Sequence, residues 1–531
     1  MTAITPFAAG SYTTTRNTTQ LLALKNQLST LSTQLSTGLT AQTYGGLGTG
    51  RSTALSAQST LSALTGYAAG ITAAQTRTQV AVTSLTQVAT LGSSTKTTLE
   101  NGSQSTAVNP TASKTLAQNN LEAALDALNQ SAGGSYLFGG SNTSTEPVVD
   151  ADKILNGTID SNGNTLAGLK TAISEQVTAD LGAGSNGRLT QTSPGGTTPT
   201  GTTLSTTQVG ITEDTSARST PAFGFALAGA PTTTGSALTA TYTPSASGSP
   251  ASFTVNVATQ PAVGDNMTFT LNLPDGTSTT LTLSAATTED ATSTTSFAIG
   301  SDTSATATNL STTLNNALKA AASSTLTASA TARSATNFFS ASSATVAAGT
   351  APLRVTTDAN GEPSYTPGKA TDTVIWYQGE DGNSDPRSTQ SVQVSATSTV
   401  QTGVRANETP IANVLAGLAT VALGMSSSSD ANATAIYNAI SSRAQTLLSS
   451  TDTSPSVQDT VTELSLASTR LSNAATTNTA TQNTLQNTLD GIEQAPTEEI
   501  ATKLLDLQNR LQASYQITAS LSKLSLVNYI S

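Results

Sequence analysis

Residues 20–38, QLLALKNQLSTLSTQLSTG, decide how the fold is read, because their leucines recur at the spacing of a packed helix. Intervals of three and four residues alternate along this stretch, which gives a period of 3.5 and places the leucines on one face. These leucines are Leu21, Leu24, Leu28, Leu31 and Leu35. The pattern predicts helices across residues 15–130, interrupted by the glycines at 45–50 and by Pro110, and ending at Gly133-Gly134.

The C-terminal stretch, residues 405–531, repeats this spacing. Its first seam, with two polar positions, consists of Leu464, Leu471, Ala475, Asn478, Gln482, Leu485, Leu489 and Ile492. The seam continues after Pro496 with Ile500, Leu504, Leu507, Leu511, Tyr515, Leu521 and Leu524. Pro496 favours a new helix start, with Thr497 as its cap and Glu498 and Glu499 in its first turn. The sequence therefore predicts a helical arm at each end of the chain.

Between the arms, residues 135–404 are rich in Thr, Ser, Gly and Pro and carry short alternating apolar runs. Two such runs, at 267–273 and 281–283, flank Pro274-Asp275-Gly276, which predicts a β-hairpin. We also expect strands at 253–257, 374–377 and 391–400, a helix at 310–318, and a flexible linker at 194–207.

The predicted fold is multidomain and combines α and β structure. Long, coiled-coil-like helical arms at both termini are expected to pack together, with β-rich (α+β) middle domains projecting outward. A chain of 531 residues exceeds a single core, which supports several domains. The expected divisions are 1–134 for the N-terminal arm, 135–218 for the first part of the middle domain, 219–370 for an inserted β-rich outer domain, 371–404 for its return strands, and 405–531 for the C-terminal arm.

Composition excludes several kinds of chemistry. The chain has no cysteine and no histidine, so disulfides, thiolate nucleophiles, Cys/His zinc sites and imidazole bases cannot form. Only 10% of residues are charged, the net charge is −11, and no basic cluster occurs, which argues against nucleic acid as a partner. No apolar run approaches ~18 residues, so we expect no membrane insertion. Residues 1–10 lack the features of a cleaved signal peptide.

The predicted arms consist of weak helix formers. Thr, Ser and Asn crowd the positions beside the leucines, and each costs up to about 0.7 kcal/mol of helix propensity relative to Ala. Isolated helices are marginal in water even with good formers. We therefore expect the arms to pack with each other and with neighbouring copies, and their outer parts to become ordered on assembly. Periodicity alone leaves open that the leucines form the core of an ordinary helical bundle.

Three short motifs carry a resemblance to a known family. Residues 34–38, QLSTG, close the first leucine run, and residues 135–143, SYLFGGSNT, follow the glycine stop. Residues 511–516, LQASYQ, and 524–530, LSLVNYI, occur near the C-terminus. In this order the motifs resemble the flagellin superfamily and, within it, the family of hook-associated protein 3, which forms the hook–filament junction.

The resemblance implies a structural, non-enzymatic subunit of the bacterial flagellum. It implies export without a cleaved signal through the flagellar type III route, with an export chaperone, to an extracellular location. The implied assembly is self-association in a helical ring or tube, with the arms inside and contacts to the hook-side junction protein and flagellin. Two departures stand out. Residues 43–51, TYGGLGTGR, replace the acidic stretch usual in flagellins, and the middle is longer than a compact junction protein needs.

The leucines of the two helical seams are the candidate assembly residues, and we expect no catalytic, cofactor-binding or metal site. The candidates are Leu21, Leu24, Leu28, Leu31, Leu35, Leu464, Leu471, Leu485, Leu489, Leu504, Leu507, Leu511 and Leu524.

Other conspicuous residues are explained without catalysis. Residues 46–50, GLGTG, lack the Lys-Ser/Thr pair and the preceding strand of a phosphate loop, so a turn between helices is favoured. The acidic pairs Glu289-Asp290 and Glu380-Asp381 belong to no convergent acid/base set, and residues 380–385 lack the ligand alternation of a calcium loop. We expect Trp376 and Tyr377 to be a buried pair and not a ligand anchor.

Four functions stay open at this point. They are a hook–filament junction subunit, a filament flagellin, a secreted adhesin-like binding protein that uses its β insert, and a carboxylate hydrolase. The YLFGG segment and the C-terminal tail favour the junction subunit.

Overall fold

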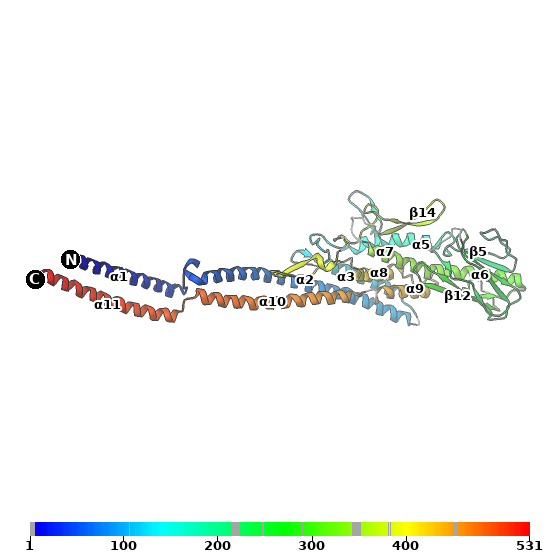
Figure 1. Ribbon diagram of the computed structural model, residues 1–531. Helices are drawn as coiled ribbons and strands as arrows, with labels where there is room; N and C mark the ends of the chain where they lie inside the picture. The colour runs from blue at the N-terminus through cyan, green and yellow to red at the C-terminus, as the bar shows by residue number, and fades with distance from the viewer. Residues whose placement is uncertain are drawn as a thin grey trace. The chain divides into compact units, whose positions relative to one another are not determined.

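The structure, a computed structural model, describes residues 6–105, 107–214, 223–246, 249–288, 290–341, 352–380, 382, 384–449 and 455–530, with side chains in the terminal helices at residue 12 and from 14 to 520. The chain is mixed α and β, with long helices at both ends and a β-rich middle, as predicted (Figure 1). Its contacts define two compact units. Unit 1 comprises Met1–Thr72, Gln393–Thr399 and Arg470–Ser531, and unit 2 comprises Ala73–Val392 and Val400–Thr469.

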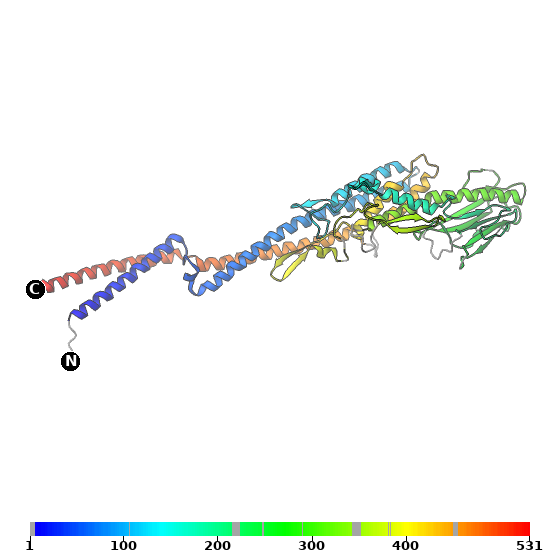
Figure 2. The ribbon, with the colours of Figure 1, turned by 90° about the horizontal axis from the view of Figure 1, so that it is seen from above.

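Unit 1 is predominantly helical. Its elements are α1 (Pro6–Thr37), the 3₁₀ helix η1 (Tyr44–Gly50), the first part of α2 (Arg51–Ser103), the last part of α10 (Val457–Glu493) and α11 (Thr497–Ile530). Helices α1 and α11 lie side by side in both views (Figure 1, Figure 2). The predicted interruptions at the glycine cluster and at Pro496 are confirmed. Gly48, at φ +55°, adopts a backbone conformation that favours glycine.

In unit 2, two sheets and a helix share one core. The first sheet has the strand order β5-β6-β10-β9, and the second has the order β13-β12-β11-β7, with β8 also paired to β11. The elements are β5 (Thr190–Thr192), β6 (Gln208–Thr212), β7 (Ala226–Leu227), β8 (Thr232–Thr233), β9 (Leu238–Thr243), β10 (Ser252–Val257), β11 (Asn266–Asn272), β12 (Ser278–Ala286), β13 (Ser296–Ala298) and α6 (Thr303–Ala321).

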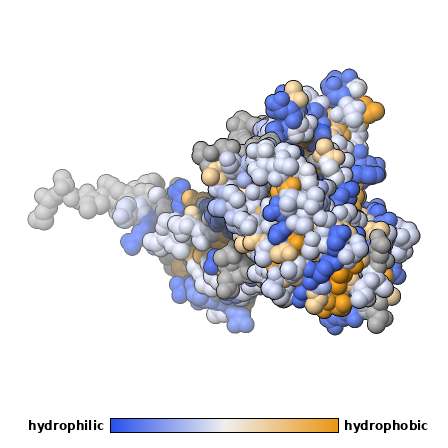
Figure 3. All heavy atoms as spheres, turned by 90° about the vertical axis from the view of Figure 1, so that its right-hand side faces the viewer, coloured by the Kyte–Doolittle hydropathy of each residue, from blue (hydrophilic) through white to orange (hydrophobic). Residues whose placement is uncertain are grey.

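Strand alternation builds this β core. Phe253 of β10 and Phe269 of β11 point inward from the two sheets, with ring centroids 5.2 Å apart. Leu310 and Leu314 of α6 join them. The predicted hairpin at 267–283, the strand at 253–257 and the helix at 310–318 are therefore confirmed. The face of the molecule in Figure 3 is mostly polar, with strongly hydrophobic residues confined to small areas.

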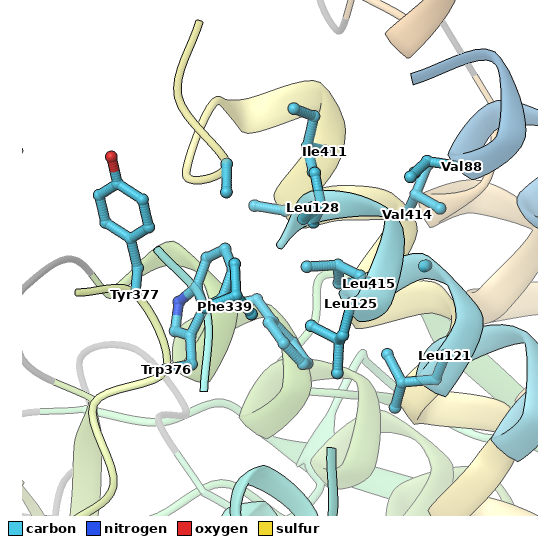
Figure 4. Packing of buried hydrophobic residues seen from close by; sticks show 14 of the residues in the cluster. Val88, Leu121, Leu125, Leu128, Phe339, Trp376, Tyr377, Ile411, Val414 and Leu415 are labelled. Atoms are coloured by element: carbon cyan, nitrogen blue, oxygen red, sulfur yellow. The ribbon is translucent and has the colours of Figure 1, made fainter. Parts of the chain in front are cut away.

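The second core of unit 2 is helical. It is formed by parts of α2 and α10 with α3 (Pro110–Leu128), α5 (Leu169–Leu181), α7 (Thr327–Ser340) and α8 (Thr409–Gly424), and α9 (Ala433–Leu447) packs beside them. Helix α8 is buried on nearly every face, as expected of a helix that is apolar all round. Figure 4 shows its Leu415 beside Leu125 of α3, and Phe339 of α7 beside Trp376. The predicted burial of Trp376 and Tyr377 is confirmed.

Short elements complete unit 2. They are β1 (Ser131–Ala132), β2 (Ser135–Tyr136), α4 (Ala151–Asn156), β3 (Thr158–Ile159), β4 (Thr165–Leu166), the π-helical turn η2 (Ala322–Leu326), β14 (Leu353–Thr357), β15 (Pro363–Pro367) and η4 (Pro386–Thr389). A hairpin of β16 (Ser391–Ser395) and β17 (Ser398–Gln401) carries the tip that belongs to unit 1.

Three local predictions are wrong. Residues 374–377 form no strand. Their side chains are all buried in the core, but their backbone forms only one isolated bridge, between Val148 and Tyr377, so no ladder develops. Residues 391–400 turn back on themselves as β16 and β17 instead of forming one strand. Residues 194–207 are not a linker. They connect β5 to β6 within one sheet, and a bridge between Thr197 and Thr203 closes the loop.

The segments on either side of residue 218 share the cores of unit 2. Strand β6, before this position, pairs with β10, after it. Helix α6 continues through η2 into α7, so this helical run contributes Leu310 to the β core and Phe339 to the helical core. The described part of 219–370 is thus packed into both cores.

Candidate functional site: the paired terminal helices

Helices α1 and α11 present matching seams to each other. From Leu35 toward the N-terminus the seam positions follow at intervals of four, three, four and three residues, ending at Leu21. From Ile500 toward the C-terminus the intervals are the same and end at Ser514. The prediction of Tyr515 as the seam residue after Leu511 is therefore wrong, since Tyr515 is 54% exposed. Ile500 and Leu507 are buried, whereas the seam residues Leu21, Leu24, Leu28, Leu31, Leu504, Leu511 and Ser514 are half-buried. The two antiparallel helices therefore meet along one narrow apolar stripe.

A second seam within unit 1 joins the start of α2 to the end of α10. Ala54 and Ala57 of α2 are buried against Leu489 of α10, with Leu47, Leu61, Leu485 and Ile492 around them. Small alanine side chains let the two helices approach closely. Gly50 serves the same purpose, because a Cβ at this position would lie 2.9 Å from Cγ2 of Ile492.

The breaks in the helices are hydrogen-bonded to each other. Leu39, in the break after α1, forms an antiparallel bridge with Gln494, in the break between α10 and α11. The Thr40 backbone N–H donates to the Glu493 carbonyl at 2.7 Å, and the Ala495 N–H donates to the Gly38 carbonyl at 2.9 Å. The Thr40 hydroxyl also donates to the Gln494 carbonyl at 3.0 Å. Two segments far apart in the sequence thus form one small piece of sheet.

The QLSTG motif has a structural role at this bridge. Gly38 ends α1 with φ +69°, the left-handed conformation typical of a helix C-terminus. The Gln34 amide donates to the Thr40 carbonyl at 2.7 Å, and the Thr37 hydroxyl accepts from the Leu39 N–H at 3.3 Å. The motif therefore both stops the helix and shapes the segment that forms the bridge.

Large apolar side chains remain exposed in unit 1, most of them on helix faces away from the seams. Leu22 of α1 is 55% exposed and Leu505 of α11 is 61% exposed, although each lies next to a seam residue in the sequence. The others in unit 1 are Tyr12, Leu35, Leu39, Tyr44, Leu55, Tyr515 and Ile517. A pair of helices can bury only one face of each, so these residues stay available to a further surface.

The polar seam residue Asn478 has a specific partner. Its side chain is buried, and its amide donates to the backbone carbonyl of Val394, at the tip of the β16–β17 hairpin, at 3.1 Å. Val394 is also buried. Asn478 therefore fixes the hairpin tip on α10, which explains a polar residue at an otherwise apolar heptad position.

Charges contribute little to this site. In the described part of α11 the ion pairs Glu499–Lys503, at 2.6 Å, and Asp506–Arg510, at 3.0 Å, lie within the helix and are exposed. The hydrogen bond from Lys503, with its charge, lowers the pKa of Glu499. Exposed pairs of this kind stabilise only weakly. Apolar contacts and backbone hydrogen bonds are therefore the main attraction between the helices.

The carboxylates considered as catalytic or calcium-binding groups serve as hydrogen-bond acceptors where the structure describes them. Glu380 accepts from the Ser141 N–H at 2.7 Å, and this bond lowers the pKa of Glu380. Asp290 accepts from the hydroxyl and the N–H of Thr292, and both bonds lower its pKa. Asp385 caps η4. Glu289, Asp381 and Asn383 lie outside the described residues. Within the described residues no three acidic groups are placed to hold a metal ion.

The predicted assembly leucines divide by environment. Leu464, Leu471, Leu489 and Leu507 are buried, and Leu21, Leu24, Leu28, Leu31, Leu485, Leu504 and Leu511 are half-buried. Leu35 is 40% exposed, and Leu524 belongs to α11 but its side chain is not described. Sequence reasoning missed Ala54 and Ala57, whose interval of three continues the seam, and it missed the backbone bridge, for which residue spacing carries no signal.

Neither a family model nor a curated protein matches this chain. In the described part of the chain, none of the helices combines the length and the apolar character needed to cross a bilayer.

Proposed function

We propose that this chain is a structural subunit of the bacterial flagellum that joins the hook to the filament by polymerising through its terminal helices. The observation that carries the proposal is the set of exposed apolar side chains on α1, α2 and α11, including Leu22, Leu55 and Leu505. They lie on helices whose other face is already committed to a seam. The resemblance of the QLSTG, SYLFGGSNT and C-terminal motifs to the hook–filament junction family supports the same proposal.

The energetics favour assembly through these helices. Full burial of a leucine contributes roughly 1.5–3 kcal/mol, and most leucines in the seam of α1 and α11 are only partly buried. Neighbouring copies that cover the exposed faces would supply the remainder. The outer parts of α1 and α11 would then become fully ordered only in the assembly, as coiled-coil-like arms.

The rest of the proposal follows from the resemblance. The subunit would be extracellular and exported without a cleaved signal, with an export chaperone before assembly. It would contact the hook-side junction protein on one side and flagellin on the other, with the middle domains facing outward. It would act without catalysis and without a cofactor.

A filament flagellin is the alternative within the same class, because the same helices would serve a high-copy filament. Electron microscopy of flagella from a strain that lacks this chain separates the two. In that strain, bare hooks with filament protein shed to the medium would support the junction role, and bare hooks with no filament protein in the medium would support the alternative. A less favoured adhesin-like binding protein would keep its function without either terminal arm.

The assembly mechanism is tested by placing charge in the seam. The double variant Leu504→Asp/Leu511→Asp should abolish incorporation into flagella, because two carboxylates would have to be buried without partners. Incorporation is measured by microscopy and by fractionation of sheared flagella. Fluorescence of Trp376, the single tryptophan, checks that the helical core of unit 2 is folded.

A matched control uses the same chemical change elsewhere. Val263 is 64% exposed on unit 2, so Val263→Asp should leave incorporation unchanged. Leu505→Asp, on the exposed face of α11, should reduce incorporation while leaving the seam with α1 intact. Normal assembly of the Leu504/Leu511 double variant would refute the helical-arm mechanism.

A further inference from the structure

The apolar seam between α1 and α11 does not define its own register. Its intervals of four and three residues repeat every seven, on both helices. Sliding α1 along α11 by one heptad, about 10 Å, would again place apolar positions opposite each other near the bridge, where Leu21, Leu24 and Leu28 would face Leu507, Leu504 and Ile500. An energy term other than leucine packing must therefore select one register.

The usual selectors of register offer little here. In coiled coils, register is set by a polar residue in the seam or by charge pairs between the helices. Helix α1 has only two charged residues, Arg16 and Lys25. In the described part of α11 the ion pairs lie within that helix. Two polar positions lie at the outer end of the seam. They are Ser514 on α11, whose small hydroxyl tolerates either neighbour, and the half-buried Asn17 on α1, four residues before Leu21.

The backbone bridge supplies the interaction that selects one register. We infer that the hydrogen bonds between Gly38–Thr40 and Glu493–Ala495 fix the heptad register of the α1–α11 arm. These bonds join specific residues, so a slide of even one position breaks all three of them. Gly38 and Pro496 stop the helices at this level, which prevents the bridge from being replaced by continued helix. Leucine packing then gives affinity, and the bridge gives the alignment.

This inference concerns a single chain and stands independently of the proposed function. It can be tested by disulfide cross-linking, because the natural chain has no cysteine to interfere. Counted outward from the bridge, Leu28 and Leu507 are each the third seam position of their helices. The pair Leu28→Cys/Leu507→Cys therefore reports the bridged register, and Leu21→Cys/Leu507→Cys reports a slip of one heptad. The full-length chain is oxidised at high dilution, and intramolecular disulfides are measured as a mobility shift. A heptad slip far exceeds the Cα separation that a disulfide permits.

In the otherwise unsubstituted chain, the observed-register pair should cross-link at least about tenfold faster than the slipped pair. The bridge is then removed by Thr40→Pro with Ala495→Pro, which deletes both backbone N–H donors. Leu39 and Gln494, the preceding residues, form a β-bridge, so their extended backbone accepts a following proline. Without the bridge, the rates of the two pairs should become equal within about threefold.

The matched control is Thr40→Val, which removes the hydroxyl bond but keeps the N–H. It should retain the preference for the observed register. The inference is overturned if the double proline variant keeps the full preference, or if the bridged chain cross-links both pairs equally or neither. Trp376 fluorescence, measured on every variant, identifies any chain whose helical core has unfolded. For such a chain the single changes Thr40→Pro and Ala495→Pro are used instead, and each should weaken the preference.

Discussion

The helical pair α1–α11 and the helical core of unit 2 are both built on leucine seams, yet they are stabilised to very different extents. Leu415 of α8 is fully buried and is surrounded by side chains from several helices. Leu28 of α1 is only half-buried, with one helix opposite it. The same residue type, at the same helical spacing, thus contributes a complete core in one region and an incomplete one in the other.

The two regions also differ in how their charged residues are paired. Unit 2 contains largely buried ion pairs between different elements, such as Arg333 of α7 with Asp180 of α5, and Arg443 of α9 with Asp275. In α11 the described ion pairs join residues one turn apart on an exposed surface. Buried pairs depend strongly on geometry and so specify one arrangement of the elements they join. Among the described side chains of α1 and α11 no such buried pair joins the two helices, and the backbone bridge is their specific contact.

The largest effect we predict comes from Leu415→Ala. It should destabilise unit 2 by about 2–5 kcal/mol, because it leaves a cavity at a fully enclosed site. Denaturant unfolding followed by Trp376 fluorescence measures this loss, since Trp376 belongs to the same core. A shift of less than about 1 kcal/mol would mean that this core is not the rigid part of the molecule.

Much of the fold follows from periodicity and turn chemistry. The hairpin at 267–283 was predictable because Pro274-Asp275-Gly276 separates two runs of clean alternation, and the restart after Pro496 was predictable because proline cannot continue a helix. The strand predicted at residues 374–377 is wrong because these residues are apolar for another reason. They are buried in the helical core on all sides and do not belong to a sheet. A short apolar run is ambiguous from sequence alone.

The candidate site was predictable only in part. Leucine spacing identifies which face of each helix is apolar, but it does not reveal that Leu22 and Leu505 stay exposed while their neighbours are covered. The exposure of these two leucines depends on how many helices surround the seam. The bridge at Leu39 and Gln494 is formed by backbone groups, which every residue carries. It therefore cannot be predicted from the pattern of side chains.

A smaller loss of stability is expected from Asp275→Asn, which tests the buried ion pairs of unit 2. Burial raises the pKa of Asp275, but the hydrogen bonds from Thr277 and the charge of Arg443 outweigh it and hold the pKa below its usual value. Since the folded pKa is the lower one, the carboxylate contributes stability at and above about pH 4 and loses it as the pH falls further.

The asparagine variant lacks that contribution at every pH. Its deficit relative to the natural chain should be about 1 kcal/mol at pH 7 and should shrink toward zero below pH 4. Denaturant titrations at pH 7, 5 and 3, again followed by Trp376, measure it. The matched change Asp126→Asn, at an exposed position on α3, should cost less than about 0.5 kcal/mol at pH 7. A deficit that does not vary with pH would contradict the role of the Asp275 charge.

The smallest effect on the isolated chain is expected from Leu28→Ala, the counterpart of Leu415→Ala in the α1–α11 seam. Half-burial and a single facing helix limit its cost to under about 1 kcal/mol, because the surroundings can collapse onto the smaller side chain or leave it to solvent. The Trp376 transition should stay where it is, and only the far-ultraviolet circular dichroism, which includes the terminal helices, should change slightly. In the assembled state the same substitution should cost more, since neighbouring copies would complete the burial of Leu28. Equal losses in the isolated and assembled chain would show that the seam gains nothing from assembly, and the contrast between the two regions would then be one of degree alone.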